Sequence, residues 1–156
     1  MLLNEAQVLS KLLISNDLTI SVAESCTGGS LSRALTSIPG ASSYFDCGYI
    51  TYSNKSKTEM LGVDIQTIKT YGAVSEEVVL EMVIGVTTKS HSDVAISITG
   101  VAGPTGGTPE KPVGMVCFGF SYDDKTSTST QLFSGDRASI VSQSVSYALK
   151  QLSFRF

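Results

Sequence analysis

The sequence predicts an α/β fold, in which helices cover both faces of a mixed β-sheet in a layered α/β/α arrangement. Helical and strand patterns alternate over the first hundred residues, which is typical of parallel strands joined by helices. Two consecutive strand patterns, at 113–122 and 126–133, flank the turn Asp123-Asp124-Lys125 and predict a late antiparallel hairpin. We expect a single domain over residues 1–156, because this length suits one hydrophobic core.

Six segments carry the apolar spacing or the capping signals of helices. Asn4 is expected to cap the first helix. The apolar face of this first helix comprises Ala6, Val8, Leu9, Leu12 and Leu13. Pro39 and Gly40 stop the second helix, and acidic Glu76 and Glu77 favour the start of the strongest one. The expected helices after the first are residues 28–38, 54–61, 65–70, 75–89 and 136–152.

Strand patterns and one long loop suggest where a site would form. The expected strands before the hairpin are residues 19–23, 48–52 and 94–99. Segment 100–112 is rich in glycine and proline and has no periodicity, and loops of this length inside small domains are often functional. The strand ends at Ala23, Tyr52 and Thr99 are expected to converge on one sheet edge, where α/β sheets usually bind ligands.

Composition excludes several classes of partner. The net charge is −3 and no run of Lys or Arg stands out, so neither a nucleic acid nor a membrane is expected as a partner. No stretch of about 18 apolar residues could span a bilayer. The N-terminus has neither a basic region nor a cleavable hydrophobic segment, so a cytoplasmic protein is expected.

Cysteine and histidine are too few and too scattered to suggest a metal site. The three cysteines, Cys26, Cys47 and Cys117, form no C-x-x-C pair and are expected to be reduced thiols. The single histidine, His91, ends a predicted helix, where a solvated side chain is favoured. We therefore expect no metal and no cofactor.

The segment 22–29 is the first candidate for chemistry. It places a serine, a cysteine, a threonine and two glycines between a predicted strand and a predicted helix. Backbone N–H groups at such a helix start can hold a phosphate or the oxyanion of a reaction intermediate. Neither a P-loop pattern nor a G-x-S-x-G elbow surrounds Ser25, so two familiar site types are excluded.

A lysine could activate Ser25, because the only histidine is predicted to be solvated. Lys57 falls in the first turn of the helix that Ser53 or Asn54 would cap. The helix dipole and burial would both lower its pKa from about 10.4 toward the range of a general base. Tyr52 could donate to the pair or relay protons between them. The residues alone favour ordinary surface lysines and an ordinary strand tyrosine over this arrangement.

Other candidates have alternatives of their own. Cys26 could be a thiolate nucleophile at the helix start, or a buried inert thiol. The loop 103–108 could cradle a phosphate or a ribose, or be a plain connector. Arg137 could bind a phosphate or a carboxylate, or form an ion pair with Asp136 or Glu24.

Five blocks of the sequence together resemble the family of the C-terminal domain of competence/damage-inducible protein A (CinA). The blocks are AESCTGG at 23–29, YSNKSK at 52–57, YGAVSEE at 71–77, ITGVAGPTGGTPEKPVG at 98–114 and FSGDR at 133–137. The resemblance implies a metal-independent serine amidohydrolase that converts nicotinamide mononucleotide to nicotinic acid mononucleotide and ammonia. It also implies self-association, with a dimer favoured, and it suggests that the larger N-terminal domain of full-length CinA is absent.

The resemblance assigns roles to positions of this sequence. Ser25 would be the nucleophile, Lys57 its activating base and Tyr52 a supporting catalytic residue. The expected substrate-binding and oxyanion residues are Cys26, Thr27, Gly28, Gly29, Thr99, Gly100, Gly103, Thr105, Gly106 and Arg137. The family often has a second arginine where this chain has Val141, so an anion contact from that position is not expected here.

Three other functions are compatible with the sequence. The chain could bind a nucleotide without turning it over, since the glycine-rich loops do not themselves require catalysis. It could hydrolyse an amide through Cys26 instead of Ser25. It could also be a serine amidase whose substrate is a different carboxamide.

Overall fold

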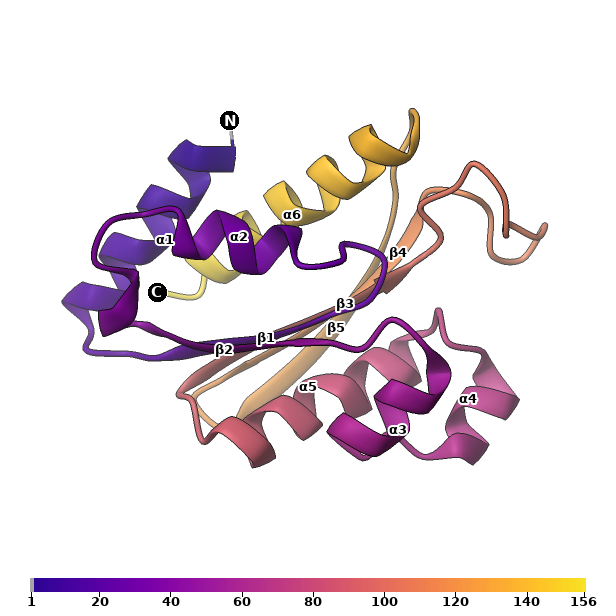
Figure 1. Ribbon diagram of the computed structural model, residues 1–156, viewed down its shortest axis with the longest axis horizontal. Helices are drawn as coiled ribbons and strands as arrows, with labels where there is room; N and C mark the ends of the chain where they lie inside the picture. The colour runs from indigo at the N-terminus through magenta and orange to yellow at the C-terminus, as the bar shows by residue number, and fades with distance from the viewer. Residues whose placement is uncertain (1) are drawn as a thin grey trace.

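The computed structural model describes residues 2–156 and consists of one β-sheet between two layers of helices (Figure 1). The strands are β1 (Ile20–Glu24), β2 (Phe45–Ile50), β3 (Val94–Gly100), β4 (Met115–Tyr122) and β5 (Lys125–Leu132). Their order in the sheet is β2-β1-β3-β4-β5. β1 pairs in parallel with β2 and β3, whereas β3–β4 and β4–β5 are antiparallel. The predicted layered α/β fold with a mixed sheet is confirmed.

Each face of the sheet is covered by three of the six α-helices found in residues 2–156 (Figure 1). One face carries α1 (Leu2–Ser15), α2 (Ser30–Thr36) and α6 (Arg137–Ser153); the other carries α3 (Asn54–Leu61), α4 (Ile65–Tyr71) and α5 (Glu76–Ser90). A short 3-10 helix, Ala41–Ser43, precedes β2. None of these helices is long and apolar enough to cross a bilayer.

Two hydrophobic clusters, one on each face, hold the layers to the sheet. Val22 of β1 belongs to the cluster under α1, α2 and α6, and the next residue, Ala23, belongs to the cluster under α3 and α5. This alternation follows from the two-residue period of a strand and explains why every residue of β1 is buried.

Three local predictions are wrong in detail. Asn4 lies inside α1, not at its cap, and Val8 is 47% exposed, because the stripe facing the core is narrower than expected. β2 runs over Phe45–Ile50, so Tyr52 lies beyond it. α2 begins at Ser30, since Gly28 and Gly29 have positive φ angles of 54° and 99° that a right-handed helix does not adopt.

The parallel pairing fixes where a site can form. Because β1, β2 and β3 run in one direction, the residues after Glu24, Ile50 and Gly100 all emerge at the same edge of the sheet. The turn to α2, the segment leading to α3 and the loop 101–114 therefore meet at this edge. The strand pattern of the sequence predicts the same convergence.

Candidate active site

A serine and a lysine meet at the carboxyl edge of the parallel strands. Ser25 follows β1 directly, and Lys57 projects from the first turn of α3. The Nζ atom of Lys57 lies 2.9 Å from Oγ of Ser25. Both side chains are buried, with exposed fractions of 1% for Lys57 and 8% for Ser25. The structure thus brings together the two residues that the sequence suggested as base and nucleophile.

The start of α3 explains the position of Lys57. Ser53 caps the helix by accepting a hydrogen bond from the Ser56 N–H, and the Ser56 hydroxyl in turn accepts one from the Ser53 N–H. This reciprocal cap fixes the first turn immediately after β2. Lys57 and Asn54, three residues apart, therefore share a helix face that points toward Ser25 and the pocket.

Two backbone carbonyls hold the Lys57 amine. Its Nζ atom donates to the carbonyl oxygen of Thr51 at 2.7 Å and to that of Tyr52 at 3.3 Å. Burial lowers the pKa of Lys57 to about 8, against a smaller opposing effect of the Cys26 thiol. A neutral amine has two N–H donors and one lone pair. With both donors directed at carbonyls, the lone pair is left for the Ser25 hydroxyl.

A pocket of about 280 Å³ opens next to this pair. Its walls come from five parts of the chain: the turn after β1, the start of α3, the connection before α5, the loop after β3, and the start of α6. The lining residues are Ser25, Cys26, Tyr52, Asn54, Lys57, Ala73, Val74, Thr99, Gly100, Val101, Ala102, Gly103, Thr105, Gly106 and Arg137. All expected substrate-binding residues except three are among them.

The three exceptions are Thr27, Gly28 and Gly29, which do not line the pocket. The Gly28 N–H donates to the carbonyl of Ser25 at 3.1 Å, and the Gly29 N–H donates to the Glu24 carboxylate at 3.1 Å. Two of the expected oxyanion donors are thus used inside the fold. Among the described residues, the N–H groups of Cys26 and Thr27 donate to no other residue, and Cys26 directly follows the serine. It is the better candidate for an oxyanion donor.

Tyr52 does not lie between the serine and the lysine. Its side chain is 59% exposed, and its hydroxyl accepts a hydrogen bond from Nη2 of Arg137 at 2.9 Å. Among the described residues no hydrogen bond joins this hydroxyl to Ser25 or Lys57, so the proton relay through it stays a prediction. Tyr52 instead supplies a backbone carbonyl to Lys57 and a side-chain wall to the pocket.

Arg137 joins two walls of the pocket. Besides Tyr52, it contacts the carbonyl of Gly103 through Nη1 at 2.9 Å. It forms no ion pair with Asp136, which caps α6 by accepting from the Ser139 N–H, and none with Glu24. Its positive charge therefore has no carboxylate partner among the described residues, as a group that receives an anionic ligand would require.

The two remaining candidates for nucleophile and base are disfavoured by their surroundings. Burial raises the pKa of Cys26 to about 12, so its thiol is protonated near neutral pH. His91 is the C-cap of α5 with a left-handed φ of 58°. It precedes β3, whereas Ser25 follows β1, which is parallel to β3, so His91 and Ser25 lie at opposite ends of the sheet.

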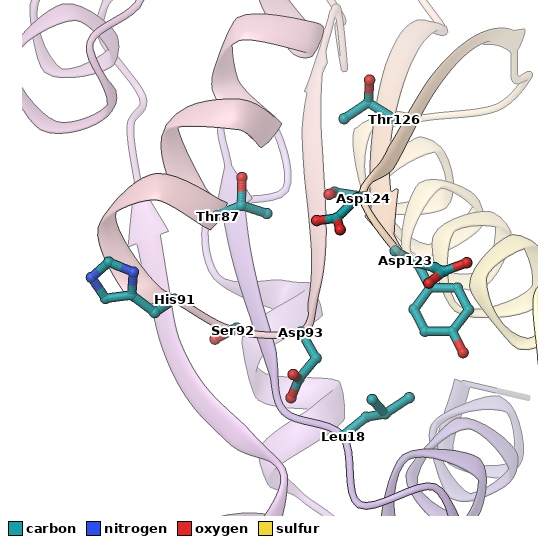
Figure 2. A pocket seen from close by; sticks show the side chains of 10 residues that line it. Leu18, Thr87, His91, Ser92, Asp93, Asp123, Asp124 and Thr126 are labelled. Carbon is teal, nitrogen blue, oxygen red and sulfur yellow. The ribbon is translucent and has the colours of Figure 1, made fainter.

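A larger hollow of about 630 Å³ lies at the His91 end (Figure 2). Figure 2 shows Asp93, Asp123 and Asp124 around it, together with hydroxyl side chains. Asp93 already accepts hydrogen bonds from the Thr19 N–H and hydroxyl, each at 2.8 Å. Over residues 2–156, no group of three or more His, Cys, Asp or Glu side chains is placed to hold a metal ion.

Two residues at the carboxyl edge of the parallel strands, Asn54 and Glu24, were not among the site residues predicted from the sequence. Asn54 lines the pocket, and its three-residue spacing to Lys57 was a usable signal. Glu24 is completely buried beneath the turn that carries Ser25. No periodicity or spacing indicates such a carboxylate, because its partners are backbone N–H groups five to eight residues later.

The fold and the site define an α/β domain that presents a buried serine hydroxyl to a lysine amine at the carboxyl edge of its parallel strands. Comparison with known families makes this more specific. Residues 3–155 match the CinA C-terminal domain, and the chain belongs to that family.

Individual relatives agree over most of the chain. The nicotinamide-nucleotide amidohydrolase PncC of Enterobacter agglomerans is 50% identical over 84% of this chain and 80% of that protein. The protein of the same name from Escherichia coli is 43% identical over 97% of this chain and 92% of that protein. A CinA-like protein of Endomicrobium trichonymphae is 49% identical over 94% of this chain, which spans only 34% of that longer relative.

Solved structures show the same architecture. The competence or damage-inducible protein of Enterobacter asburiae superposes with a TM-score of 0.96 at 35% identity, covering 99% of this chain and 98% of that one. The competence/damage inducible protein CihA of Agrobacterium tumefaciens gives a TM-score of 0.94 at 37% identity, covering 97% and 93%.

Proposed function

We propose that this protein is a metal-independent serine amidohydrolase that converts nicotinamide mononucleotide to nicotinic acid mononucleotide and ammonia. The observation that carries the proposal is the 2.9 Å contact between the Lys57 amine and the Ser25 hydroxyl inside a pocket. The names of the PncC relatives, which match most of this chain, support amide hydrolysis and a nucleotide substrate.

The chemistry would begin with the neutral Lys57 amine. It takes the Ser25 proton as Oγ attacks the carboxamide carbon, and a C–O bond forms while the carbonyl oxygen becomes an oxyanion. The Cys26 N–H, next to the nucleophile and without another partner in the described residues, donates to this oxyanion. Lys57 then protonates the leaving nitrogen, so that the C–N bond breaks and ammonia departs.

The second half of the reaction reuses the same base. Lys57, neutral again, takes a proton from water as the water oxygen attacks the acyl-enzyme. The ester bond to Ser25 breaks, Oγ recovers its proton, and the free carboxylate is released. The carbonyls of Thr51 and Tyr52 keep the amine in one orientation through both halves.

The opposite wall suits the nucleotide part of the substrate. The N–H groups of Gly103, Thr105 and Gly106 make no hydrogen bond among the described residues, and all three residues line the pocket. Arg137 adds a positive charge at the same wall. These donors would hold the phosphate or ribose, while the carboxamide faces Ser25.

Two alternatives remain as outcomes of the test. A nucleotide-binding module without turnover would have no use for a buried amine beside a hydroxyl, and Lys57 is 1% exposed. An amidase for a different carboxamide would keep the reactive pair and differ in the recognition wall. Self-association as a dimer and a cytoplasmic location remain predictions.

The test is a direct assay. Purified protein is incubated with nicotinamide mononucleotide, while ammonia and nicotinic acid mononucleotide are measured in equal amounts over time. We expect turnover by the natural protein in the presence of a chelator, and none by Ser25→Ala. Product formation by Ser25→Ala at the full rate would overturn the mechanism, and activity only on other amides would overturn the substrate.

A further inference from the structure

Glu24, the last residue of β1, has no role in the steps above. It is a completely buried carboxylate with no ion-pair partner among the described residues. Isolated buried charges are strongly unfavourable unless hydrogen bonds compensate them. Four hydrogen bonds do so here, and all of them come from the start of α2.

The carboxylate takes the place of a helix cap. Its Oε2 atom accepts from the N–H groups of Gly29 and Leu31 at 3.1 and 3.0 Å. Its Oε1 atom accepts from the N–H and the hydroxyl of Ser32 at 2.8 and 2.7 Å. The formal cap position, Gly29, has no side chain to do this. The end of the strand is thus tied to the start of the next helix.

Backbone hydrogen bonds also hold the turn that carries the nucleophile. Ser25 is the first residue of this turn, and its N–H donates to the carbonyl of Ile98 at 3.0 Å. On the other side, the Glu24 carbonyl accepts from the Thr51 N–H at 2.9 Å. Glu24 thus precedes the nucleophile in the chain, and its backbone is hydrogen-bonded to Thr51, whose own carbonyl holds the Lys57 amine.

The charge of Glu24 also matters. By taking the first N–H groups of α2, the carboxylate keeps the positive end of that helix from acting as an anion site beside Ser25. Oxyanion stabilisation then depends on the turn itself, where the Cys26 N–H remains without a partner. The position of this N–H, like that of Oγ, depends on how the turn is held.

We propose that Glu24 is a positioning residue, which holds the Ser25 hydroxyl in line with the Lys57 amine by tying the start of α2 to the end of β1. Glu24→Gln keeps the shape of the side chain but directs an NH₂ group at N–H donors. Glu24→Asp keeps the charge but shortens the reach. Both variants should misplace Ser25 by a fraction of an ångström to about an ångström, a displacement that can reduce a rate about a hundredfold.

Two measurements separate positioning from simple stability. The first, which depends on the proposed function, is steady-state hydrolysis of nicotinamide mononucleotide: kcat should fall between about tenfold and a hundredfold, with KM nearly unchanged. The second does not depend on it. Diisopropyl fluorophosphate labels an activated serine: a bond forms between Oγ and phosphorus, the P–F bond breaks, fluoride leaves and the hydroxyl proton passes to the base. Labelling of Ser25 should slow by the same factor.

A matched control comes from α4, which has the same length as α2. α4 also has seven residues and is also capped by a carboxylate, Asp64, which accepts from the Gln66 N–H at 2.8 Å and does not line the pocket. Asp64→Asn should leave kcat and labelling per folded molecule unchanged, whatever its effect on stability. If both Glu24 variants behave like Asp64→Asn, the proposal fails. If Glu24→Gln does not fold, Glu24→Asp alone decides. If the natural protein is labelled but releases no ammonia, the proposed function fails and labelling still tests Glu24.

Discussion

The two ends of the sheet carry hollows of very different character. The hollow at the amino end of β3 encloses about 630 Å³ and the pocket at its carboxyl end about 280 Å³. The larger one is surrounded by carboxylates and hydroxyls, of which Asp93 is already held by the neighbouring Thr19 (Figure 2). The smaller one contains a buried amine 2.9 Å from a buried hydroxyl. Reactivity follows convergence and burial of polar groups, not the volume of a hollow.

The largest expected effect is the loss of activity when Lys57, at the carboxyl end of the parallel strands, is replaced. Replacement of His91, at their amino end, is the comparison. Lys57→Met should reduce amide hydrolysis about a thousandfold, because a general base typically contributes 10²- to 10⁴-fold. His91→Ala should leave the rate unchanged, since His91 caps α5 at the far end of the sheet. The measurement is kcat/KM with each variant at constant pH.

Lys55→Met is the matched control for Lys57→Met. Lys55 is two residues away on the same helix, where its side chain is 80% exposed and lies 3.7 Å from Glu59. It should have no effect on the rate. Loss of activity in His91→Ala or Lys55→Met, with Lys57→Met active, would place the chemistry elsewhere.

The second prediction concerns pH. Lys57 acts only when neutral, and its pKa is lowered to about 8. kcat/KM should therefore rise about tenfold per pH unit below 8 and level off above it. Between pH 6 and pH 8 the rise is about fiftyfold, and the plateau lies about a hundredfold above the value at pH 6. A plateau that extends down to pH 6 would contradict a lysine base, whereas a midpoint near 6.5 would indicate a histidine.

The third and smallest effect is on stability. The pKa of Lys57 is about 8 in the folded protein and near 10.5 in an unfolded chain, so burial of the charged amine opposes folding below pH 8. As pH rises from 8 toward 10.5, the folded protein loses this proton while the unfolded chain still binds it, and the opposition disappears. The free energy of unfolding of the natural protein, relative to Lys57→Met, should rise by about 3 kcal/mol over this window.

Denaturant unfolding of both proteins at pH 7 and pH 10 measures this difference. Lys57→Met also leaves the Thr51 carbonyl without its donor, but that loss does not depend on pH and cancels from the comparison. Lys55→Met, compared in the same way, should show no such dependence, because its amine is exposed. If the free energy of unfolding changed with pH in the same way in the natural protein and in Lys57→Met, burial would not disfavour the charged form of this amine.

Much of the fold could be predicted from the sequence because its signals are local. Ser53, Ser75 and Asp136 cap α3, α5 and α6, so three helix starts were visible as residue types at the right positions. The bounds of β2 were harder to predict, since Asp46 is a poor strand former and the strand forms there because it pairs with β1. Such pairing depends on tertiary contacts, which a single-chain pattern does not contain.

The site was predictable only in part for the same reason. Ser25 and Lys57 could be proposed as a pair because each stands at a helix start after a strand end. The hydrogen bonds that the Gly28 and Gly29 N–H groups make within the fold could not be predicted, because they depend on the orientation of the Glu24 side chain and on the conformation of the loop. The direction of the Tyr52 side chain, toward Arg137, depends on a residue 85 positions later.

The loop 101–114 leaves β3 and returns in β4, its antiparallel neighbour, and both of its arms are tied together. The Val101 N–H donates to the Met115 carbonyl, and the Gly114 N–H donates to the Val101 carbonyl. The tip can therefore change its residues without moving the strands that support Ser25. Under the proposed function, most of the recognition wall and the Ser25–Lys57 pair lie on separate segments, so exchange of this loop is expected to change the preferred amide while the reactive pair is kept.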